Sequence, residues 1–452
     1  MKIIIVGCGK VGRSITEELS AEGHDVVVID SRYDIVEDVS NTYDVMGMVG
    51  NGASFSVQLE AGIESADVLI AVTNSDELNL LCCLIAKKGG DCKTIARVRN
   101  PMYNSDIGFI KEELGVSMII NPELAAATEI ARILRFPSAI EIDTFAKGRV
   151  ELLEFKIAPS SFLAGCSVRE VSKKVKAEVL ICAVERGEEV IIPNGNFVLA
   201  EGDNLSIVAS PLHARNFFAG IGIETHQVKN TTIVGGGTIA YYLAMQLLKM
   251  GIEVKIVEKN LKRCEELSEL LPEAVIIHAD ATNYQVLIEE GIEGCESFVP
   301  LTGIDEGNVF LSLYAKKHSK AKTITKINRV CFDDVISTFN LGSIISPKKT
   351  TSEYILRYVR AMKNSLGSKV ETLYKIVDDK AEALEFAIRE NNQLIDKPLE
   401  ELKLKDNLLI ACINRKGEIL APNGKTRILL GDTVIVVTTQ KGLHDITDIL
   451  RA

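Results

Sequence analysis

Residues 1–30 read MKIIIVGCGKVGRSITEELSAEGHDVVVID. The apolar runs Ile3–Val6 and Val26–Ile29 predict two buried strands, and the spacing of apolar residues over 13–19 predicts a helix between them. A G-x-G-x-x-G turn joins the first strand to this helix, and the second strand ends at Asp30. Strand, glycine turn, helix, strand and acid in this order are typical of a dinucleotide-binding unit.

Each position of the glycine turn has a physical reason. Gly7 allows the tight turn out of the strand, Gly9 lets a pyrophosphate approach the backbone, and Gly12 lets the helix pack close to the sheet. The start of the helix offers free N–H groups and a positive dipole end to phosphates. Asp30 can accept hydrogen bonds from both hydroxyls of an adenosine ribose. A glycine turn without a ligand is the alternative, and the complete context favours a ligand.

The motif limits what the sequence says about this ligand. It recognises the ADP moiety, which NAD, ATP and ADP share. The negative charge of Asp30 disfavours a 2′-phosphate, so NADP is the weaker candidate, although Arg32 lies two residues further on. The choice between NAD (NADH or NAD+) and ATP/ADP therefore stays open.

Composition excludes several functional classes. The chain has 452 residues, enough for two to four domains, and 46% of them are hydrophobic. A net charge of −11 argues against a nucleic-acid partner. No apolar run approaches the length of a membrane span, and no signal peptide precedes the first strand. The ten cysteines contain no C-x-x-C pair and the six histidines show no ligand spacing, so we expect reduced thiols and no metal site.

The first half of the chain returns in the second half. Residues Ile233–Ala240 repeat the first strand and its glycine turn. Gly7 and Gly235 are 228 positions apart, and so are Asp30 and Glu258. Further downstream the triplet Pro-Asn-Gly and the pair Gly-Asp each recur at a spacing of 229. A constant offset over this length indicates a tandem repeat.

The predicted fold class is α/β, a tandem repeat of a Rossmann-like, doubly wound parallel sheet followed by a small α+β domain. The leucine-rich face of helix 76–87 (Leu78, Leu81, Leu84 and Ile85) is expected to pack on the first sheet. The small domain is expected to hold four strands and one helix near Val168–Val175. The predicted domains are residues 1–136 and 229–365 for the nucleotide folds, and 140–226 and 368–452 for the small folds.

Ligands of doubly wound sheets lie across the carboxyl ends of the strands, and three places in the first half reach that edge. Asn51 follows the third strand, Thr73 and Asn74 follow the fourth, and Arg97 follows the fifth. A helix cap is the alternative role for the Thr73 segment, and a surface ion pair is the alternative for Arg97. The predicted first site comprises Gly7, Cys8, Gly9, Lys10, Val11, Gly12, Asp30, Asn51, Thr73, Asn74 and Arg97.

The second half predicts a second, modified site. Ala240 replaces the third glycine, Glu258 replaces Asp30, and Lys326 stands at the position of Arg97. We therefore expect a nucleotide there with a different preference or affinity. The residues of this predicted site are Gly235, Gly236, Gly237, Thr238, Ile239, Glu258 and Asp280.

A set of motifs spans the whole chain. They are Gly7–Gly12, Gly50–Gly52, Ala66–Asn74, Asp76–Asn79, His278–Thr282, Leu301–Thr302, Asp305–Glu306, Asn308, Ser346–Pro347 and Tyr354–Leu356. With them the chain resembles the RCK (KTN) regulatory family, and within it the regulatory subunits of Trk potassium-uptake systems. The tandem order of nucleotide fold and small fold is specific to those subunits. Gly303 and Ile304 depart from the pattern of the first half.

The resemblance implies a function. It implies a cytoplasmic subunit, peripheral on the inner face of the cell membrane, that docks on an integral-membrane Trk-type potassium transporter and gates it. It implies binding of NAD(H), with ATP/ADP as alternative ligands, and assembly into a homo-oligomer, either a dimer or a tetrameric ring.

Two other functional classes remain. An NAD-dependent oxidoreductase would need a His, Lys or Tyr placed to move a proton, and neither small fold shows such a set, so we expect no enzymatic activity. A nucleotide sensor for a different membrane partner is the third hypothesis.

Overall fold

A computed structural model describes the chain, and its residues group into two compact units. Met1–Ala131 and Val228–Val359 form one unit, and Arg132–Gln227 and Arg360–Ala452 form the other. The described residues are 1–103, 106–135, 141–145, 150–159, 161–175, 177–187, 189–222, 227–328, 339, 341–365, 370–377, 380–443 and 445–451. The predicted domain ends at 136, 140, 226 and 368 lie outside these residues, and the four-domain division stays a prediction.

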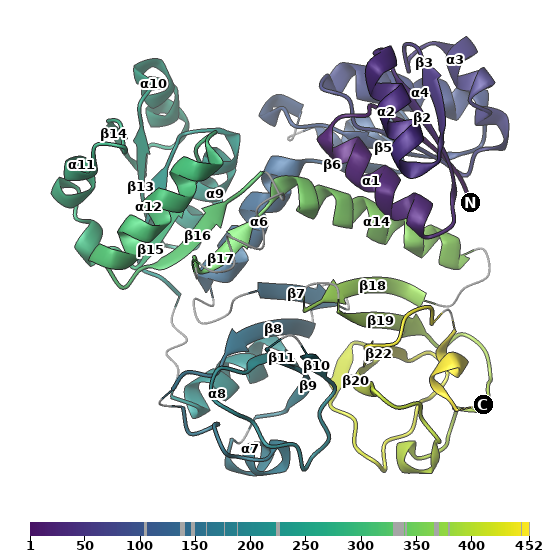
Figure 1. The fold of residues 1–452 in the computed structure, drawn as a ribbon, viewed down its shortest axis with the longest axis vertical. Helices are drawn as coiled ribbons and strands as arrows, with labels where there is room; N and C mark the ends of the chain where they lie inside the picture. The colour runs from purple at the N-terminus through teal and green to yellow at the C-terminus, as the bar shows by residue number, and fades with distance from the viewer. Residues whose placement is uncertain are drawn as a thin grey trace. The chain divides into compact units, whose positions relative to one another are not determined.

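The first nucleotide fold is a six-stranded parallel sheet in the order β3-β2-β1-β4-β5-β6 (Figure 1). This is the strand order of dinucleotide-binding folds, so the predicted fold class is confirmed. Its strands are β1 Lys2–Val6, β2 Asp25–Asp30, β3 Met46–Val49, β4 Val68–Ala71, β5 Lys93–Arg97 and β6 Met118–Ile120. Its helices are α1 Lys10–Ala21, α2 Tyr33–Tyr43, α3 Phe55–Glu60, α4 Asp76–Gly89, α5 Ile107–Glu113 and α6 Pro122–Arg135.

Helix α4 packs on the sheet by a different face from the one predicted. Its buried apolar residues are Cys82, Cys83 and Ala86, whereas Leu81 is 45% exposed. Small side chains let the helix axis approach β4 and β5 closely. The contacts made by this close packing stabilise the structure more than burial of the larger leucine face would at a greater distance from the sheet. The predicted leucine face was therefore wrong for Leu81.

The second nucleotide fold repeats the first, in the order β14-β13-β12-β15-β16-β17. Its strands are β12 Asn230–Val234, β13 Glu253–Glu258, β14 Val275–His278, β15 Ser297–Pro300, β16 Lys322–Lys326 and β17 Ser343–Ile345. Its helices are α9 Thr238–Lys249, α10 Leu261–Leu270, α11 Tyr284–Glu289, α12 Asp305–His318 and α14 Pro347–Ser365. Its core is more polar: the hydroxyls of Thr231 and Ser297 lie 2.6 Å apart, where the first fold has Ile3 and Val68.

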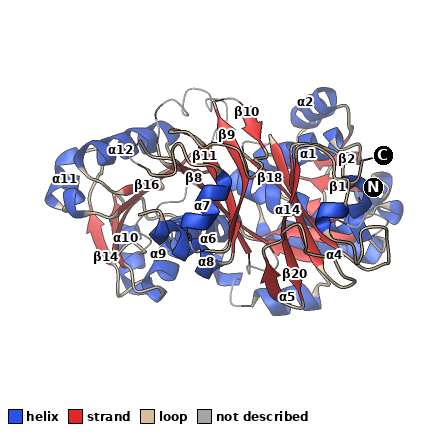
Figure 2. Cartoon of the chain, turned by 90° about the horizontal axis from the view of Figure 1, so that it is seen from below, coloured by secondary structure: helices blue, strands red, loops and turns tan. Residues whose placement is uncertain are grey.

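Each small fold is a five-stranded antiparallel sheet, with strand orders β10-β9-β11-β8-β7 and β18-β19-β22-β20-β21. Strands of both sheets, among them β8, β9, β18 and β20, are drawn in red in Figure 2. The first contains β7 Glu141–Phe145, β8 Val150–Lys156, β9 Val179–Arg186, β10 Glu189–Ile191, β11 Asn204–Ala209, α7 Val168–Lys174 and α8 Pro211–Gly220. The second contains β18 Val370–Ile376, β19 Ala381–Ala387, β20 Leu408–Arg415, β21 Glu418–Leu420 and β22 Thr433–Thr438.

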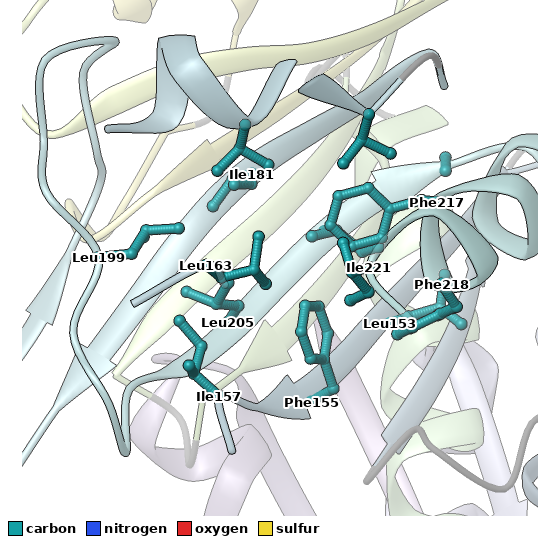
Figure 3. Close-up of a cluster of buried hydrophobic side chains, with 14 of the residues drawn as sticks. Leu153, Phe155, Ile157, Leu163, Ile181, Leu199, Leu205, Phe217, Phe218 and Ile221 are labelled. Atoms are coloured by element: carbon teal, nitrogen blue, oxygen red, sulfur yellow. The ribbon is translucent and has the colours of Figure 1, made fainter. Parts of the chain in front are cut away.

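The prediction of one helix in the first small fold was wrong, because α8 is also present. Ser210 caps it by accepting a hydrogen bond from the N–H of His213, and Pro211 stands in its first turn. Phe217 and Phe218 of α8 pack edge-on against Phe155 of the sheet (Figure 3). The Ser-Pro start signal was present in the sequence. Among the described residues, no helix combines the length and the apolar character needed to cross a bilayer.

An arginine–aspartate pair recurs in both small folds. Arg186 donates from Nε and Nη2 to the two carboxylate oxygens of Asp203, at 2.8 and 2.7 Å. Arg415 makes the same bidentate contact to Asp432, at 2.9 and 2.8 Å. Burial alone would raise the pKa of Asp203, but the bonds from Arg186 and a backbone N–H hold it below its ordinary value.

We predict that Arg186→Ala destabilises the first small fold by roughly 1–2 kcal/mol, because Asp203 is buried while the arginine is half-exposed and partly screened. Scanning calorimetry near neutral pH should show a lower melting temperature. Since the pKa of Asp203 is lowered by folding, the contribution is present at neutral pH and is lost as the pH falls through the folded-state pKa. The difference between variant and parent should therefore shrink in acid.

Arg415→Ala is the matched variant in the second small fold and should have a similar effect. Equal melting temperatures of parent and Arg186→Ala at neutral pH would contradict the prediction.

Candidate functional site

The glycine turn of the first fold contains two positions required by packing and one open position. Gly7 has a φ of 101°, and a Cβ there would lie 2.9 Å from the Thr73 backbone nitrogen. A Cβ on Gly12 would lie 1.9 Å from the Gly7 carbonyl oxygen. A Cβ on Gly9, in contrast, would meet no atom within 4 Å. The space beside Gly9, at the start of α1, is therefore open to a ligand.

The acid at the end of β2 holds the glycine turn in place. One carboxylate oxygen of Asp30 accepts the N–H of Cys8 at 2.8 Å, and the other accepts the N–H of Arg32 at 3.1 Å. A carboxylate has about four lone-pair positions, so hydrogen bonds from a ribose remain possible. Asp30 is thus a structural anchor of the turn as well as a candidate ligand contact.

A cavity of about 570 Å³ lies at the carboxyl ends of the strands. Its volume is typical of sites for small molecules and cofactors. Its walls bring together six of the predicted residues: Gly7, Gly9, Asp30, Asn51, Thr73 and Asn74. The remaining lining residues are Val6, Ile29, Ser31, Arg32, Gly50, Gly52, Val72, Ser75 and Leu78.

A second cavity of about 390 Å³ shares Gly9, Val72 and Asn74 with the first and continues from it. The predicted residues Lys10, Val11 and Arg97 line this second cavity instead of the first. Its other walls come from both nucleotide folds and consist of Arg99, Pro122, Glu123, Asn328, Pro347 and Lys348.

Two further predicted residues line neither cavity. Cys8 is buried, and burial raises the pKa of its thiol to about 12. Gly12 is buried against Gly7. Both residues shape the turn without facing the open space.

Arg97 is buried rather than part of a surface ion pair. It is 8% exposed, and its Nη2 donates to the carbonyl of Thr73 at 2.5 Å and to the side chain of Asn74 at 3.4 Å. Burial, reinforced by the charge of Arg99, lowers the pKa of Arg97. Burial also raises the pKa of Glu123 in the same wall.

Three charged atoms around this cavity lack a hydrogen-bond partner in the described chain: Nε of Arg97, Nε of Arg99 and Oε2 of Glu123. Buried polar atoms in native proteins are nearly always satisfied, by protein, water or ligand. The wall is therefore suited to a charged or strongly polar ligand group.

The segment after β4 forms a helix cap and also a wall of the cavity. The Ser75 hydroxyl caps α4 by accepting the N–H of Leu78 at 3.1 Å, which confirms the helix-cap interpretation. Thr73 and Asn74 line the cavity at the same time.

A residue that the sequence did not single out as part of the site fixes this segment. Asn79, fully buried on α4, accepts the N–H and the hydroxyl of Thr73 at 2.8 and 2.7 Å. Its amide nitrogen donates to the carbonyls of Thr73 at 3.2 Å and Arg97 at 2.8 Å. All four hydrogen-bonding positions of the amide are used. The sequence signals were the recurring Thr-x₅-Asn spacing in both halves and the presence of Asn79 and Asn308 among the motifs that carry the family resemblance.

The second fold preserves this framework. Asn308 makes the same four contacts to Thr302 and Lys326, at 2.7 to 3.3 Å. Glu258 accepts the N–H of Gly236 at 2.6 Å and that of Asn260 at 2.8 Å, as Asp30 does in the first fold.

The glycine turn of the second fold also has its open position. Gly235 has a φ of 97°, and a Cβ on Gly237 would meet no atom within 4 Å. Thr238 and Ile239 form the start of α9.

The remaining contacts of the second site differ from the first. Asp280 accepts the N–H and the hydroxyl of Thr282, which lower its pKa. Arg263 donates to the carbonyl of Gly236 at 2.7 Å, whereas the corresponding residue of the first fold is Ile35. Arg263 therefore adds a cation at the second glycine turn, where the first fold has an apolar side chain at the equivalent position.

The 570 Å³ cavity offers binding groups. Among the described residues that line it there is no His, Lys, Tyr or Cys side chain to move a proton. No cluster of three metal-ligating side chains occurs in the described ranges of the chain.

Sequence comparison matches both kinds of domain twice. Residues 3–122 and 231–347 match the TrkA-N domain, and residues 152–219 and 383–451 match the TrkA-C domain. A Trk system potassium uptake protein TrkA homolog of Archaeoglobus fulgidus is 33% identical over all of both chains. A TrkA homolog of Methanosarcina mazei is 32% identical over 99% of each.

Solved structures share the fold. The GsuK channel bound to NAD aligns with a TM-score of 0.63 at 18% identity, over 97% of this chain and 77% of that one. The GsuK RCK domain aligns with a TM-score of 0.62 at 18% identity, over 97% and 92%. The resemblance stated from the motifs is confirmed.

We predict that Gly9→Val abolishes nucleotide binding at the first site without destabilising the ligand-free protein. The backbone of Gly9 is extended, with φ −69° and ψ −172°, and the space beside it is empty, so valine fits the fold but fills the position of a pyrophosphate. Calorimetric titration should show affinity lower by on the order of a hundredfold or more.

Gly237→Val is the control, because it enters the equivalent open space of the second fold and should spare the first site. A Gly9→Val protein that binds nucleotide like the parent would place the ligand elsewhere.

We predict that Asn79→Leu both destabilises the first nucleotide fold and weakens its ligand binding. Leucine keeps the approximate shape but leaves the buried partners of the amide unsatisfied, at roughly 1–3 kcal/mol for each group. Asn79→Asp keeps the two accepted bonds but places a buried carboxylate oxygen against the carbonyls of Thr73 and Arg97, so at neutral pH it should be at least as harmful as leucine. The test measures the melting temperature and the ligand affinity of both variants, with Asn308→Leu as the matched change in the second fold. An Asn79→Leu protein with the melting temperature and ligand affinity of the parent would refute the prediction.

Proposed function

Because the chain belongs to the TrkA family of Trk system potassium uptake proteins, we propose that it is the cytosolic, nucleotide-binding regulatory subunit of a Trk-type potassium transporter. It docks on the inner face of the membrane through that transporter, as a homo-oligomer of dimeric or ring-shaped tetrameric form. Its ligand is NAD(H), with ATP and ADP as the alternatives.

The observation that carries this proposal is the 570 Å³ cavity, in which the open position at Gly9 and the carboxylate of Asp30 face one space. A pyrophosphate at the first and a ribose at the second match the ADP moiety common to these ligands. The NAD bound to the structurally similar GsuK channel supports NAD(H) among them.

The neighbouring 390 Å³ cavity suggests how binding is transmitted. Arg97 and Arg99 of the first nucleotide fold and Lys348 of the second line it together. The part of the ligand beyond the ADP pyrophosphate would reach this cavity and touch both folds. If that part is the γ-phosphate of ATP, its negative charge would stabilise the arrangement in which these cations converge, whereas the nicotinamide riboside of NAD(H) would contact the same wall through its hydroxyl and amide groups.

The two folds are also linked directly within their unit. Asn121 donates to the hydroxyl of Tyr242 at 3.1 Å, and the hydroxyl of Thr350 donates to Glu129 at 2.9 Å. A ligand shifts such an arrangement only by binding one state more tightly than another. The transporter would respond to the resulting change between the folds.

We predict that Asp30→Ala weakens nucleotide binding at the first site and removes the nucleotide dependence of potassium uptake. Loss of a charge-assisted bond, worth roughly 1.5–3 kcal/mol, corresponds to about a ten- to hundredfold lower affinity. Titration of the full chain with NADH, NAD+, ATP and ADP measures the first effect. Potassium uptake by vesicles containing the transporter, with and without nucleotide, measures the second.

Glu258→Ala is the control and should leave the first site unchanged. Uptake that responds normally to nucleotide in Asp30→Ala would contradict the proposal. Substrate-dependent consumption of NADH by the parent protein, abolished by a single substitution, would favour the oxidoreductase instead.

A further inference from the structure

We infer that Gln58, a fully buried residue of α3, sets the base specificity of the first site by fixing the loop 50–53 for recognition of adenine. The inference rests on the proposed nucleotide binding in the 570 Å³ cavity and adds which base the site selects and which residue makes the selection.

Gln58 is a polar side chain in an otherwise apolar place. Its exposed fraction is 0%, and it lies on a helix whose neighbours Val57 and Ala61 belong to the hydrophobic core. Burying a primary amide is costly unless its hydrogen bonds are made. The Nε2 group donates to the carbonyl of Gly52 at 2.7 Å and to that of Cys82 at 3.0 Å. Two carbonyl partners require the amide nitrogen at this position, so the orientation of the side chain is defined. The Oε1 atom of the same amide is buried and has no hydrogen-bond partner in the described chain.

These bonds tie the loop after β3 to helix α4. Gly52 is packed so tightly that a Cβ would lie 2.1 Å from a methyl group of Val6. The side-chain oxygen of Asn51 accepts the N–H of Ala53 at 3.0 Å, and its carbonyl accepts the N–H of Ser54 at 2.8 Å. The carbonyls of Asn51 and Gly52 and the side-chain oxygen of Asn51 are therefore engaged within the protein.

The donors of the loop are available. In the described part of the chain, no hydrogen-bond acceptor lies within reach of the backbone N–H groups of Asn51 and Gly52, and both residues line the cavity. In the sheet, β2 lies between β1 and β3. The glycine turn after β1 and the loop after β3 therefore lie on opposite sides of Asp30, the proposed ribose-binding acid at the end of β2. The base of a nucleotide that places its ribose at Asp30 would thus meet backbone donors.

The chemistry of these donors distinguishes the purines. The Watson–Crick edge of adenine presents N1 as an acceptor, whereas hypoxanthine and guanine carry a hydrogen on N1. A backbone N–H can donate to N1 of adenine, whereas it meets a second donor at the N1–H of hypoxanthine or guanine. The distinction requires a loop that cannot turn a carbonyl toward the base, and the bond from Gln58 to the Gly52 carbonyl prevents that rotation.

The second half of the chain provides a comparison. The position of Gln58 is occupied there by Leu287, which is buried against Ala281 and Leu311 in an apolar cluster. The second loop is thus held by packing and lacks the amide bond to its carbonyl. Gln58→Leu introduces into the first site the residue that the chain itself uses in the second.

The test uses the full chain carrying Gly237→Val, so that titration reports the first site. The parent should bind ADP at least about tenfold more tightly than inosine diphosphate, whose base is hypoxanthine. Gln58→Leu should weaken the binding of ADP about tenfold and reduce the preference for ADP over inosine diphosphate to about threefold or less. Gln58→Met, closer in shape and also without a donor, should act in the same way and serves if the leucine lowers the melting temperature.

The outcomes separate the inference from the proposed function. If Gln58→Leu weakened the binding of ADP and of inosine diphosphate equally, the preference for ADP would be intact. Gln58 would then have a merely structural role, and the inference would be overturned. A Gln58→Leu protein that binds ADP as tightly as the parent and keeps the parent's preference for ADP over inosine diphosphate would overturn the inference as well. Leu287→Gln, in the same background, is the control and should leave the preference of the first site as it is. A parent that binds no adenine nucleotide would overturn the proposed function together with the inference.

Discussion

The structure of each candidate site depends on one buried asparagine amide. At the carboxyl edge of a parallel sheet the strands diverge, and backbone groups lose the partners that the sheet supplied. Asn79 replaces those partners: one amide accepts two hydrogen bonds from Thr73 and donates two to the backbone, and it joins the end of β5 to the loop after β4. The chain uses the same solution at Asn308, with nearly the same distances. The cavity walls are therefore rigid where the ligand must be positioned.

Local patterns in the sequence predicted the parts of this architecture that are determined locally. The glycine turn, the acid at Asp30 and the alternation of strands and helices depend on neighbouring residues and on periodicity. The duplication was visible as a constant offset. A helix cap was also predicted as the alternative role of the segment after β4, and Ser75 forms it with the N–H of a residue three positions further on.

The parts that sequence did not predict depend on distant partners. Arginine usually lies at the protein surface. Arg97 is buried nevertheless, because the carbonyl of Thr73 and the side chain of Asn74 accept hydrogen bonds from it across the sheet edge. Helix α4 exposes Leu81 because smaller residues on another face pack closer to the strands. Gln58 resembles any exposed helical glutamine until its two carbonyl partners are known.

The open space beside Gly9 has a genetic consequence. A Cβ at this position meets no atom within 4 Å in the ligand-free chain, so we expect a protein with a small side chain there to fold, to accumulate and to escape the quality control that removes destabilised variants. In an assembly of identical chains, such subunits would join normal ones and dilute their response instead of disappearing. Alleles at Gly9 should therefore be dominant, whereas alleles at the tightly packed Gly12, which impair folding itself, should be recessive.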